Sequence, residues 1–208
     1  MKDRSVLFWD FDGVIKESVA VKSAAYAELF SHYGADIEER VRNHHECNGG
    51  MSRFEKIPLY LKWVGGSSSA RDVDRLCDEF SALVMQAVVD SAWVPGAREY
   101  IDENYMCQLF VLVTGTPQGE MEQILKMLDM ENRFREVHGA PTNKATAIDS
   151  FLARWKCKRT EALVIGDSRS DYLAASATGV DFLLRRTPLN FALQGEHRGL
   201  HCRDFIDG

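Results

Sequence analysis

The sequence contains no apolar run long enough to cross a membrane. Its longest apolar stretches, such as Leu109 to Val113, are about five residues long, whereas a spanning helix needs about twenty. The first residues, Met1 to Ser5, lack the basic start and apolar stretch of a signal peptide and lead directly into a strand-like run. We therefore expect a cytoplasmic protein with no membrane partner.

Positive charge is also scarce, because the chain of 208 residues has 25 Lys and Arg against 31 Asp and Glu, a formal net charge of -6. Without an excess of cations the protein has no overall field that would hold a polyanion, so we expect no nucleic-acid partner. The composition does not decide between a monomer and a homodimer.

The five cysteines are odd in number, widely spaced and include no C-x-x-C pair. This pattern argues against a disulfide framework and a zinc knuckle, and it predicts reduced, mostly buried thiols. The stretch His44-His45-x-Cys47 does not complete a zinc site either, because adjacent histidines on a helix point in different directions.

Short apolar strands separated by helical patterns make up much of the sequence. The strand-like runs are Ser5 to Asp10, Gln108 to Val113, Ala162 to Ile165 and Asp181 to Leu184. Continuous apolar strands that alternate with helices are typical of a parallel sheet covered on both faces. We therefore expect an α/β fold built on a doubly wound parallel sheet.

The segment between the first two strands is far longer than one crossover requires, and its pattern is almost wholly helical. A helix is expected from Val19 to Tyr33, and residues 73–88 carry an apolar stripe at three- and four-residue steps. We predict a small helical domain at residues 16–92, inserted into an α/β core formed by residues 1–15 and 93–208.

Two carboxylates, Asp10 and Asp12, follow the first strand, and Gly13 behind them permits a sharp turn. Open α/β sheets bind ligands at the carboxyl ends of their strands, so this position suits an active site. Taken alone, the motif is equally explained as a solvated turn.

The second strand runs into Thr114, Gly115 and Thr116, where the N–H groups at the start of a following helix favour an anion. Thr116 is equally explained as the N-cap of that helix. Lys144 opens a later helical pattern, where a lysine opposes the helix dipole unless an anion lies nearby. Taken alone, it is more often a surface lysine.

A second pair of acids follows a later strand, in which Gly166 precedes Asp167 and Asp171 lies four residues further on. Carboxylates of Asp10, Asp12 and Asp167 at adjacent strand ends would repel one another unless a hard divalent cation compensated them. Mg²⁺ is the expected cation. Asp171 is better explained as a helix cap or a supporting residue.

Taken together in this order, these motifs resemble those of the haloacid dehalogenase superfamily of phosphohydrolases. The family has a D-x-D-G-[TV] start, a Ser or Thr at the end of the second strand, a Lys, and a G-D-x(3)-D acidic motif. They are matched here by Asp10 to Val14, Thr114, Lys144 and Gly166 to Asp171. A helical insertion after the first motif also fits the members with a C1 cap, so the resemblance covers the whole chain.

The resemblance implies a role for each matched residue. Asp10 is the expected nucleophile, and Asp12 is the expected general acid and base. Thr114, the Gly115 amide and Lys144 would hold the oxygens of the transferred phosphoryl group.

The resemblance also implies that Mg²⁺ is held by the side chains of Asp10 and Asp167 together with the backbone carbonyl of Asp12. The expected supporting residues are Gly13, Gly166 and Asp171, and Thr116 is a further candidate to bind the substrate phosphate.

Within the insertion, the stretch from Gly49 to Lys56 resembles the substrate-facing cap segment of sugar-phosphate phosphatases and β-phosphoglucomutase. Arg53 is a candidate to bind a substrate anion in a bidentate manner, and Lys56 would supply a second charge. The same stretch fits a helix start in which Ser52 and Glu55 form a capping box, and the two interpretations do not exclude each other.

These inferences predict an enzyme, a Mg²⁺-dependent phosphatase that hydrolyses a small phosphomonoester through an aspartyl phosphate. The expected partner is a small phosphorylated metabolite such as a sugar phosphate or a phosphoglycolate-like acid. A phosphomutase remains open, because it would need Asp10 and Asp12 as well. A non-catalytic protein with this fold is disfavoured by the four intact motifs.

Overall fold

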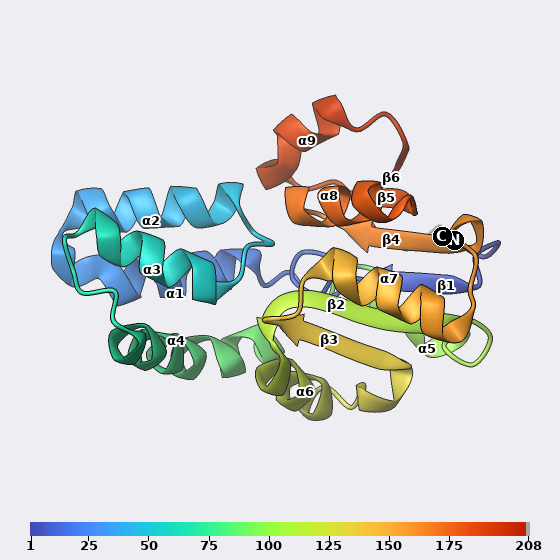
Figure 1. Cartoon of the computed structure of the whole chain (residues 1–208), viewed down its shortest axis with the longest axis horizontal. Coiled ribbons are helices and arrows are strands. Elements are labelled where there is room, and N and C mark those ends of the chain that lie inside the picture. Colours follow the sequence, from blue (N-terminus) through green and yellow to red (C-terminus); the bar gives the residue numbers. More distant parts are fainter. Residues whose placement is uncertain (207–208) are drawn as a thin grey trace.

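The structure is a computed structural model that describes residues 1–206, and a six-stranded parallel sheet forms its larger part (Figure 1). The strands are β1 (Val6–Trp9), β2 (Leu109–Pro117), β3 (Glu136–Ala140), β4 (Ala162–Gly166), β5 (Asp181–Arg185) and β6 (Leu200–Cys202). The helices of this part are α5 (Ala97–Asn104), α6 (Gln118–Met127), α7 (Lys144–Trp155), α8 (Arg169–Thr178) and α9 (Phe191–Glu196).

The strands are buried on both faces, as the continuous apolar runs predict. Alternate side chains of a strand point to opposite faces. Leu7 and Trp9 of β1 therefore pack in the core cluster that includes α5 and α6, while Val6 and Phe8 pack in the cluster that includes α7 and α8. The expected doubly wound α/β fold is confirmed.

The strand order is β3-β2-β1-β4-β5-β6, which places β1 in the middle of the sheet. The β1 strand pairs with β2 on one side and with β4 on the other. The carboxyl ends of these three parallel strands therefore lie side by side, and the residues that follow them meet there. This is the kind of crevice where open α/β sheets bind ligands. The predicted acidic motifs follow β1 and β4.

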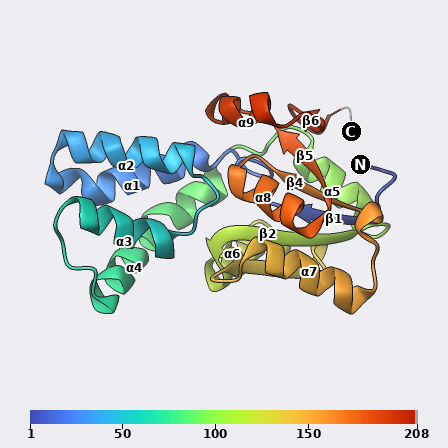
Figure 2. The same ribbon diagram turned by 45° about the horizontal axis from the view of Figure 1, so that its top comes forward.

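The helical part of the chain forms a separate body beside the carboxyl ends of the strands and is drawn in blue to green in Figures 1 and 2. It consists of α1 (Val19–Phe30), α2 (Ala35–Cys47), α3 (Arg53–Trp63) and α4 (Ala70–Asp90). An aromatic cluster holds these helices together, and Tyr26 of α1 stacks on Phe80 of α4 with ring centres 3.9 Å apart. These four helices fall within the predicted insertion, which we call the cap.

The chain enters and leaves the cap at one place. The N–H of Glu17 donates to the carbonyl of Ala92, and the N–H of Val94 donates to the carbonyl of Ile15. Lys16 is buried here, where its ammonium lies 4.3 Å from the centre of a tryptophan ring. The two connecting segments thus run side by side.

Two strands were missing from the sequence prediction. Both β3 and β6 lie at the edges of the sheet. The β3 sequence has Val137 as its one large aliphatic residue, and β6 is only three residues long. Edge strands need less apolar sequence than central ones, so the hydrophobic pattern gave little signal for them.

The thiol prediction is also partly wrong. Cys77 is buried, but Cys47 and Cys107 are exposed, and the other two cysteines are half-buried. Both exposed cysteines lie at or near helix ends, where the chain turns at the surface.

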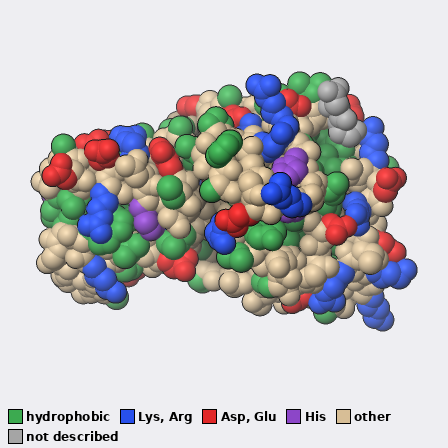
Figure 3. All heavy atoms as spheres, turned by 90° about the horizontal axis from the view of Figure 1, so that it is seen from above, with side chains coloured by type: hydrophobic (Ala, Val, Ile, Leu, Met, Phe, Trp, Pro, Cys, Tyr) green, Lys and Arg blue, Asp and Glu red, His purple; other side chains and the backbone are tan. Residues whose placement is uncertain are grey.

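In the described chain, no helix is both long and apolar enough to span a bilayer. On the face seen in Figure 3, Lys and Arg side chains are interspersed with Asp and Glu.

Candidate active site

The predicted nucleophile, Asp10, lies directly after β1 and is buried beside a lysine. Its Oδ1 atom lies 3.0 Å from Nζ of Lys144. Lys144 is the first residue of α7, and its ammonium also donates to Oδ1 of Asp171 at 2.6 Å. The lysine is therefore buried between two carboxylates, which offset its unfavourable position at a helix N-terminus.

The acids in this cluster outnumber the cations. Burial and repulsion from Asp171 raise the pKa of Asp10 to about 7, although Lys144 acts in the opposite direction. Burial and repulsion from Asp10 and Asp171 also raise the pKa of Asp167 well above its usual value. Burial disfavours charge on Lys144, but its attraction to the acids outweighs this and raises its pKa. The cluster is therefore short of positive charge.

Three of these acids are close enough to hold a metal ion. Asp10, Asp167 and Asp171 each offer one oxygen within 4.8 Å of the others. Both oxygens of Asp171 already accept hydrogen bonds, from Lys144 and from Ser168, so Asp10 and Asp167 are the better ligands. Carboxylate oxygens suit Mg²⁺, and a divalent cation would compensate the excess negative charge. The donor set therefore fits Mg²⁺.

Two glycines leave room for these carboxylates. Gly13 has φ of +72°, and a β-carbon there would lie 2.2 Å from Oδ2 of Asp167. A β-carbon on Gly166 would lie 2.2 Å from Cβ of Asp171. Asp171 also forms a capping box with Ser168 at the start of α8, which confirms its expected role as a helix cap.

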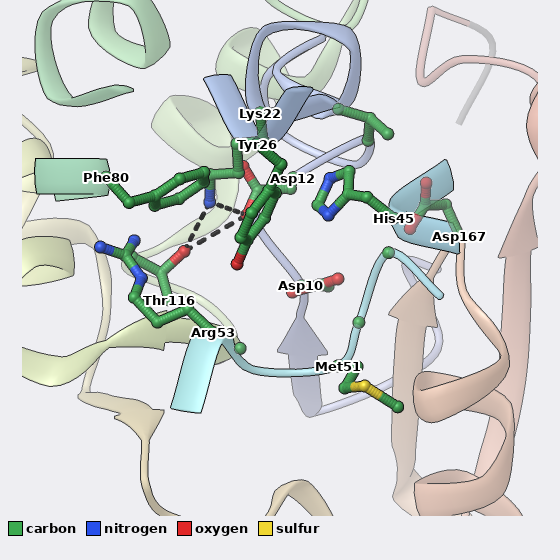
Figure 4. Close-up of a pocket in the computed structure, with 14 residues that line it drawn as sticks. Asp10, Asp12, Lys22, Tyr26, His45, Met51, Arg53, Phe80, Thr116 and Asp167 are labelled. Atoms are coloured by element: carbon green, nitrogen blue, oxygen red, sulfur yellow. Dashed lines mark hydrogen bonds and ion pairs between the residues drawn. The ribbon is translucent and has the colours of Figure 1, made fainter. Parts of the chain in front are cut away.

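The predicted phosphate-binding residues Thr114, Gly115 and Thr116 lie at the end of β2. The strand continues to Pro117 and α6 begins at Gln118, so the alternative that Thr116 is a helix N-cap is wrong. Thr114 is buried, and its hydroxyl accepts a hydrogen bond from the N–H of Thr116 at 3.2 Å. Gly115 and Thr116 line the same cavity as Asp10 (Figure 4).

The second carboxylate of the first motif, Asp12, has quite different surroundings from Asp10. The Ser18 hydroxyl donates to its Oδ1 at 2.5 Å, and the Lys22 ammonium donates to its Oδ2 and to the Thr116 hydroxyl (Figure 4). Burial disfavours charge on Asp12, but the attraction and hydrogen bond of Lys22 outweigh it and lower its pKa. The two carboxylates of one motif thus have pKa values shifted in opposite directions. The signs are the reverse of those that an anionic nucleophile at Asp10 and a protonated acid at Asp12 need, and a cation bound at Asp10 would act to lower its pKa.

Lys22 is a site residue that the sequence prediction missed. A signal was present, because Ser18, Lys22 and Tyr26 follow one another at four-residue steps and so lie on one face of α1. That face leads directly from the D-x-D motif into the cap. The motif itself gave no indication that a cap lysine would pair with Asp12.

Arg53 is the first residue of α3. The capping box that Ser52 and Glu55 were expected to form at this helix start is confirmed. The Arg53 guanidinium is buried and bonds Glu120 of α6 at 2.6 and 2.8 Å. It also donates to the Ser81 hydroxyl. The bidentate partner of Arg53 in this structure is therefore a core carboxylate, and binding of a substrate anion by Arg53 remains a prediction.

Two further cap residues face the cavity although the sequence prediction did not include them. The rings of Tyr26 and His45 lie with centres 4.8 Å apart, and both line the cavity that contains Asp10 and Asp12 (Figure 4). Behind them, Lys56 is fully buried with its Nζ 2.8 Å from Nδ1 of His45.

The cap loop, residues 48–52 between α2 and α3, closes over this cavity, whose volume is about 30 Å³. A β-carbon on Gly50 would lie 1.8 Å from the Ser170 hydroxyl and 2.4 Å from the Ser168 hydroxyl of the core. A β-carbon on Gly115 would lie 3.0 Å from the Gly50 carbonyl. The absence of side chains at these positions lets the loop approach the core closely.

The sequence pattern of the haloacid dehalogenase-like hydrolase family matches residues 6–184. The phosphorylated carbohydrates phosphatase of Thermotoga maritima is 23% identical over 84% of this chain and 82% of that protein. A phosphoglycolate phosphatase of Pseudomonas putida is 26% identical over 85% of this chain and 67% of that protein.

Solved structures share the fold over nearly the whole chain. CbbY from Rhodobacter sphaeroides in complex with phosphate has a TM-score of 0.74 at 18% identity, covering 98% of this chain and 96% of that one. The HAD-hydrolase YfnB from Bacillus subtilis, bound to magnesium, has a TM-score of 0.73 at 16% identity, with the same coverage.

Proposed function

We propose that this chain, which belongs to the haloacid dehalogenase-like hydrolases, is a Mg²⁺-dependent phosphatase of small phosphomonoesters. The observation that best supports this is the arrangement around Asp10, a buried carboxylate. It lies 3.0 Å from the ammonium of Lys144 and close to Asp167, whose pKa is raised by burial and by the neighbouring acids. The relatives named as phosphatases support the same class of substrate.

In the proposed reaction, a carboxylate oxygen of Asp10 attacks phosphorus and the bond from phosphorus to the leaving oxygen breaks. Asp12 donates a proton to that oxygen, and to do so it must first be protonated against the effect of Lys22, which lowers its pKa. The product is an alcohol and an aspartyl phosphate. The Asp12 carboxylate then takes a proton from water, whose oxygen attacks phosphorus, and inorganic phosphate leaves as Asp10 is restored.

The other residues position and neutralise the phosphoryl group. Lys144 supplies a fixed positive charge beside Asp10. We assign the donation of hydrogen bonds to phosphoryl oxygens to the Thr114 hydroxyl and the Gly115 amide, which lie at the end of the adjacent strand. Mg²⁺, when bound by Asp10 and Asp167, would neutralise the charge of the phosphoryl oxygens that the nucleophile must approach. The backbone carbonyl of Asp12 is the remaining proposed ligand.

The cap excludes bulk water from this reaction. A closed cavity strengthens the electrostatic interactions within it and restricts the size of the ester. We therefore propose a small metabolite as substrate, either a sugar phosphate or a phosphoglycolate-like acid, rather than a phosphoprotein.

The test is phosphate release from a panel of sugar phosphates, phosphoglycolate and an aryl phosphate, with and without Mg²⁺. We expect release that a chelator abolishes and that added Mg²⁺ restores. The Asp10→Asn variant should be inactive, while Asp129→Asn, a matched change at an exposed position, should keep wild-type activity.

No release from any ester would contradict the proposed function. Turnover that required a sugar bisphosphate would instead indicate the phosphomutase, in which the aspartyl phosphate returns its phosphoryl group to a sugar.

A further inference from the structure

The cap wall of the cavity contains two polar atoms that have no protein partner. No hydrogen bond to the Tyr26 hydroxyl or to Nε2 of His45 occurs within residues 1–206, although both side chains are at least 97% buried, with exposed fractions of 2% and 3%. Trp9 Nε1 is the one fully enclosed side-chain polar atom without a partner in the described chain. The Tyr26 and His45 atoms therefore reach the open space of the cavity that they line.

A buried cation lies directly behind them. Lys56 has an exposed fraction of 0%, and its Nζ lies 2.8 Å from Nδ1 of His45 and 5.6 Å from the centre of the Tyr26 ring. Among residues 1–206, no carboxylate lies within ion-pair distance of Lys56. Burial, and next the charge of Lys22, lower its pKa to about 7.

The hydrogen bond between Lys56 and His45 fixes the tautomer of the histidine. When the Lys56 ammonium donates to Nδ1, the neutral imidazole must carry its proton on Nε2. That N–H then points into the cavity as a donor. Tyr26 offers a second donor through its hydroxyl. The Lys56 ammonium polarises the imidazole of His45 and so strengthens its Nε2–H as a donor to the same space.

The other cations of the cap wall are already paired. Lys22 bonds Asp12, and Arg53 bonds Glu120. The Lys56 charge is thus the one in this wall that has no acid within ion-pair distance in the described chain, and the attraction of Asp12 and Glu55 offsets its burial only in part. Burying an unpaired charge is costly, and an anion in the cavity would remove that cost.

We propose that His45 and Tyr26, backed by Lys56, bind an anionic group on the alcohol part of the substrate, either a carboxylate or a second phosphate. This inference rests on the proposed phosphatase function, since the site faces the same cavity as Asp10. A neutral hydroxyl would satisfy the two donors but would leave Lys56 uncompensated, whereas an anion does both. Tyr26 and His45 contact the substrate, and Lys56 is a positioning residue that acts through His45.

The test compares three esters of one carbon skeleton: 3-phosphoglycerate, glycerol 1,3-bisphosphate and glycerol 3-phosphate. The alcohol part of glycerol 3-phosphate carries no charge, so we call it the neutral ester. We expect wild-type kcat/KM to be at least about tenfold higher for one of the anionic esters than for glycerol 3-phosphate. Which of the two is preferred distinguishes a carboxylate from a phosphate. Equal kcat/KM for all three esters, or a preference for the neutral one, would overturn the inference.

The Lys56→Met variant removes the charge with little change in volume. We expect it to lower the ratio of kcat/KM for the anionic ester over the neutral ester by about ten- to a hundredfold, and Tyr26→Phe to lower the ratio by several-fold. Lys62→Met, the same change at an exposed position of the same helix, should leave the ratio as in the wild type. An equal loss on all three esters in Lys56→Met would show a merely structural role and overturn the inference.

Binding without turnover separates this inference from the function on which it rests. In Asp10→Asn, calorimetry with 3-phosphoglycerate, the bisphosphate and glycerol 3-phosphate reports affinity alone. Preferred binding of an anionic ester by a protein whose wild type releases no phosphate would support the anion site and contradict the phosphatase. Hydrolysis of esters with no preference for an anionic ester in either assay would support the phosphatase and contradict the anion site.

Discussion

The two walls of the active-site cavity are built in different ways. On the core wall, Lys144 is paired within the wall itself, to Asp10 and Asp171. On the cap wall, Lys22 and Arg53 reach across to acids of the core, and Lys56 has no acid within ion-pair distance in the described chain.

In the proposed mechanism, this difference assigns the chemistry to the core wall and the selection of substrate to the cap wall. Asp10, Lys144 and Asp171 keep their geometry through contacts with one another, whereas Asp12 is paired with Lys22 of the cap. The cap charges depend on the position of the cap, because their partners belong to the core or to a bound ligand. Closure is therefore the step that joins the two functions.

The strongest test of the core wall is Lys144→Met. It would leave Asp10 and Asp171 without their shared cation, so the pKa of Asp10 should rise further and the fixed charge at the phosphoryl site would be lost. We expect kcat to fall by at least about a thousandfold, measured by phosphate release. Lys126→Met at an exposed position of α6 is the control, and a similar rate in both variants would show that Lys144 has no part in the reaction.

The pairing between the walls is tested by Glu120→Ala. It would leave the buried Arg53 guanidinium without its carboxylate, and we expect the free energy of unfolding to fall by about 3 kcal/mol in urea denaturation. Glu122→Ala changes an exposed acid on the same helix and should cost less than about 1 kcal/mol. Equal losses in the two variants would mean that the ion pair does not stabilise the closed cap.

The uncompensated charge of the cap predicts a gain of stability. The pKa of Lys56 is lowered from 10.5 to about 7, so between these values the unfolded chain binds more protons and stability rises with pH. Below pH 7 the full cost of the buried charge is present. Lys56→Met removes this cost and should raise the free energy of unfolding at pH 7 by about 1–3 kcal/mol.

The measurement for this variant is urea denaturation at pH 7 and pH 10. The advantage of Lys56→Met over the wild type should shrink as the pH approaches 10, because the folded protein loses the Lys56 proton above about pH 7, whereas the unfolded chain keeps it until near pH 10.5. The other titratable groups facing Lys56, namely His44, His45, Tyr26, Lys22, Asp12 and Glu55, are present in both proteins. A variant less stable than the wild type at pH 7 would contradict the buried charge.

The smallest expected effect concerns closure itself. A β-carbon on Gly50 would collide with Ser168 and Ser170, so Gly50→Ala should hold the cap loop away from the core and lower kcat/KM by about tenfold. Gly49→Ala is a close control, because a β-carbon there meets no atom within 4 Å. Unchanged kinetics in Gly50→Ala would show that the loop need not approach the core so closely.

The sequence predicted the central strands and the helical insertion because apolar strands and amphipathic helices leave periodic patterns. It also placed Asp10, Thr114, Lys144 and Asp167 at strand ends or a helix start. The edge strands and the exposed cysteines were missed, since neither depends on a hydrophobic repeat. Lys22 and His45 were missed because a polar residue on a cap helix looks the same whether it faces solvent or a cavity.

The sequence by itself determined that the motif residues lie together, because each motif is a short segment beside the end of a parallel strand and the pairing of those strands brings the segments together. Only the tertiary structure decided the partners of the cap charges. Arg53 and Glu120 are 67 residues apart, and periodicity fixes the face of a helix but not the group opposite that face. Hydrogen bonds act over about 3 Å, so the angle at which the cap packs on the core determines which charges pair and leaves Lys56 bonded to His45 rather than to an acid.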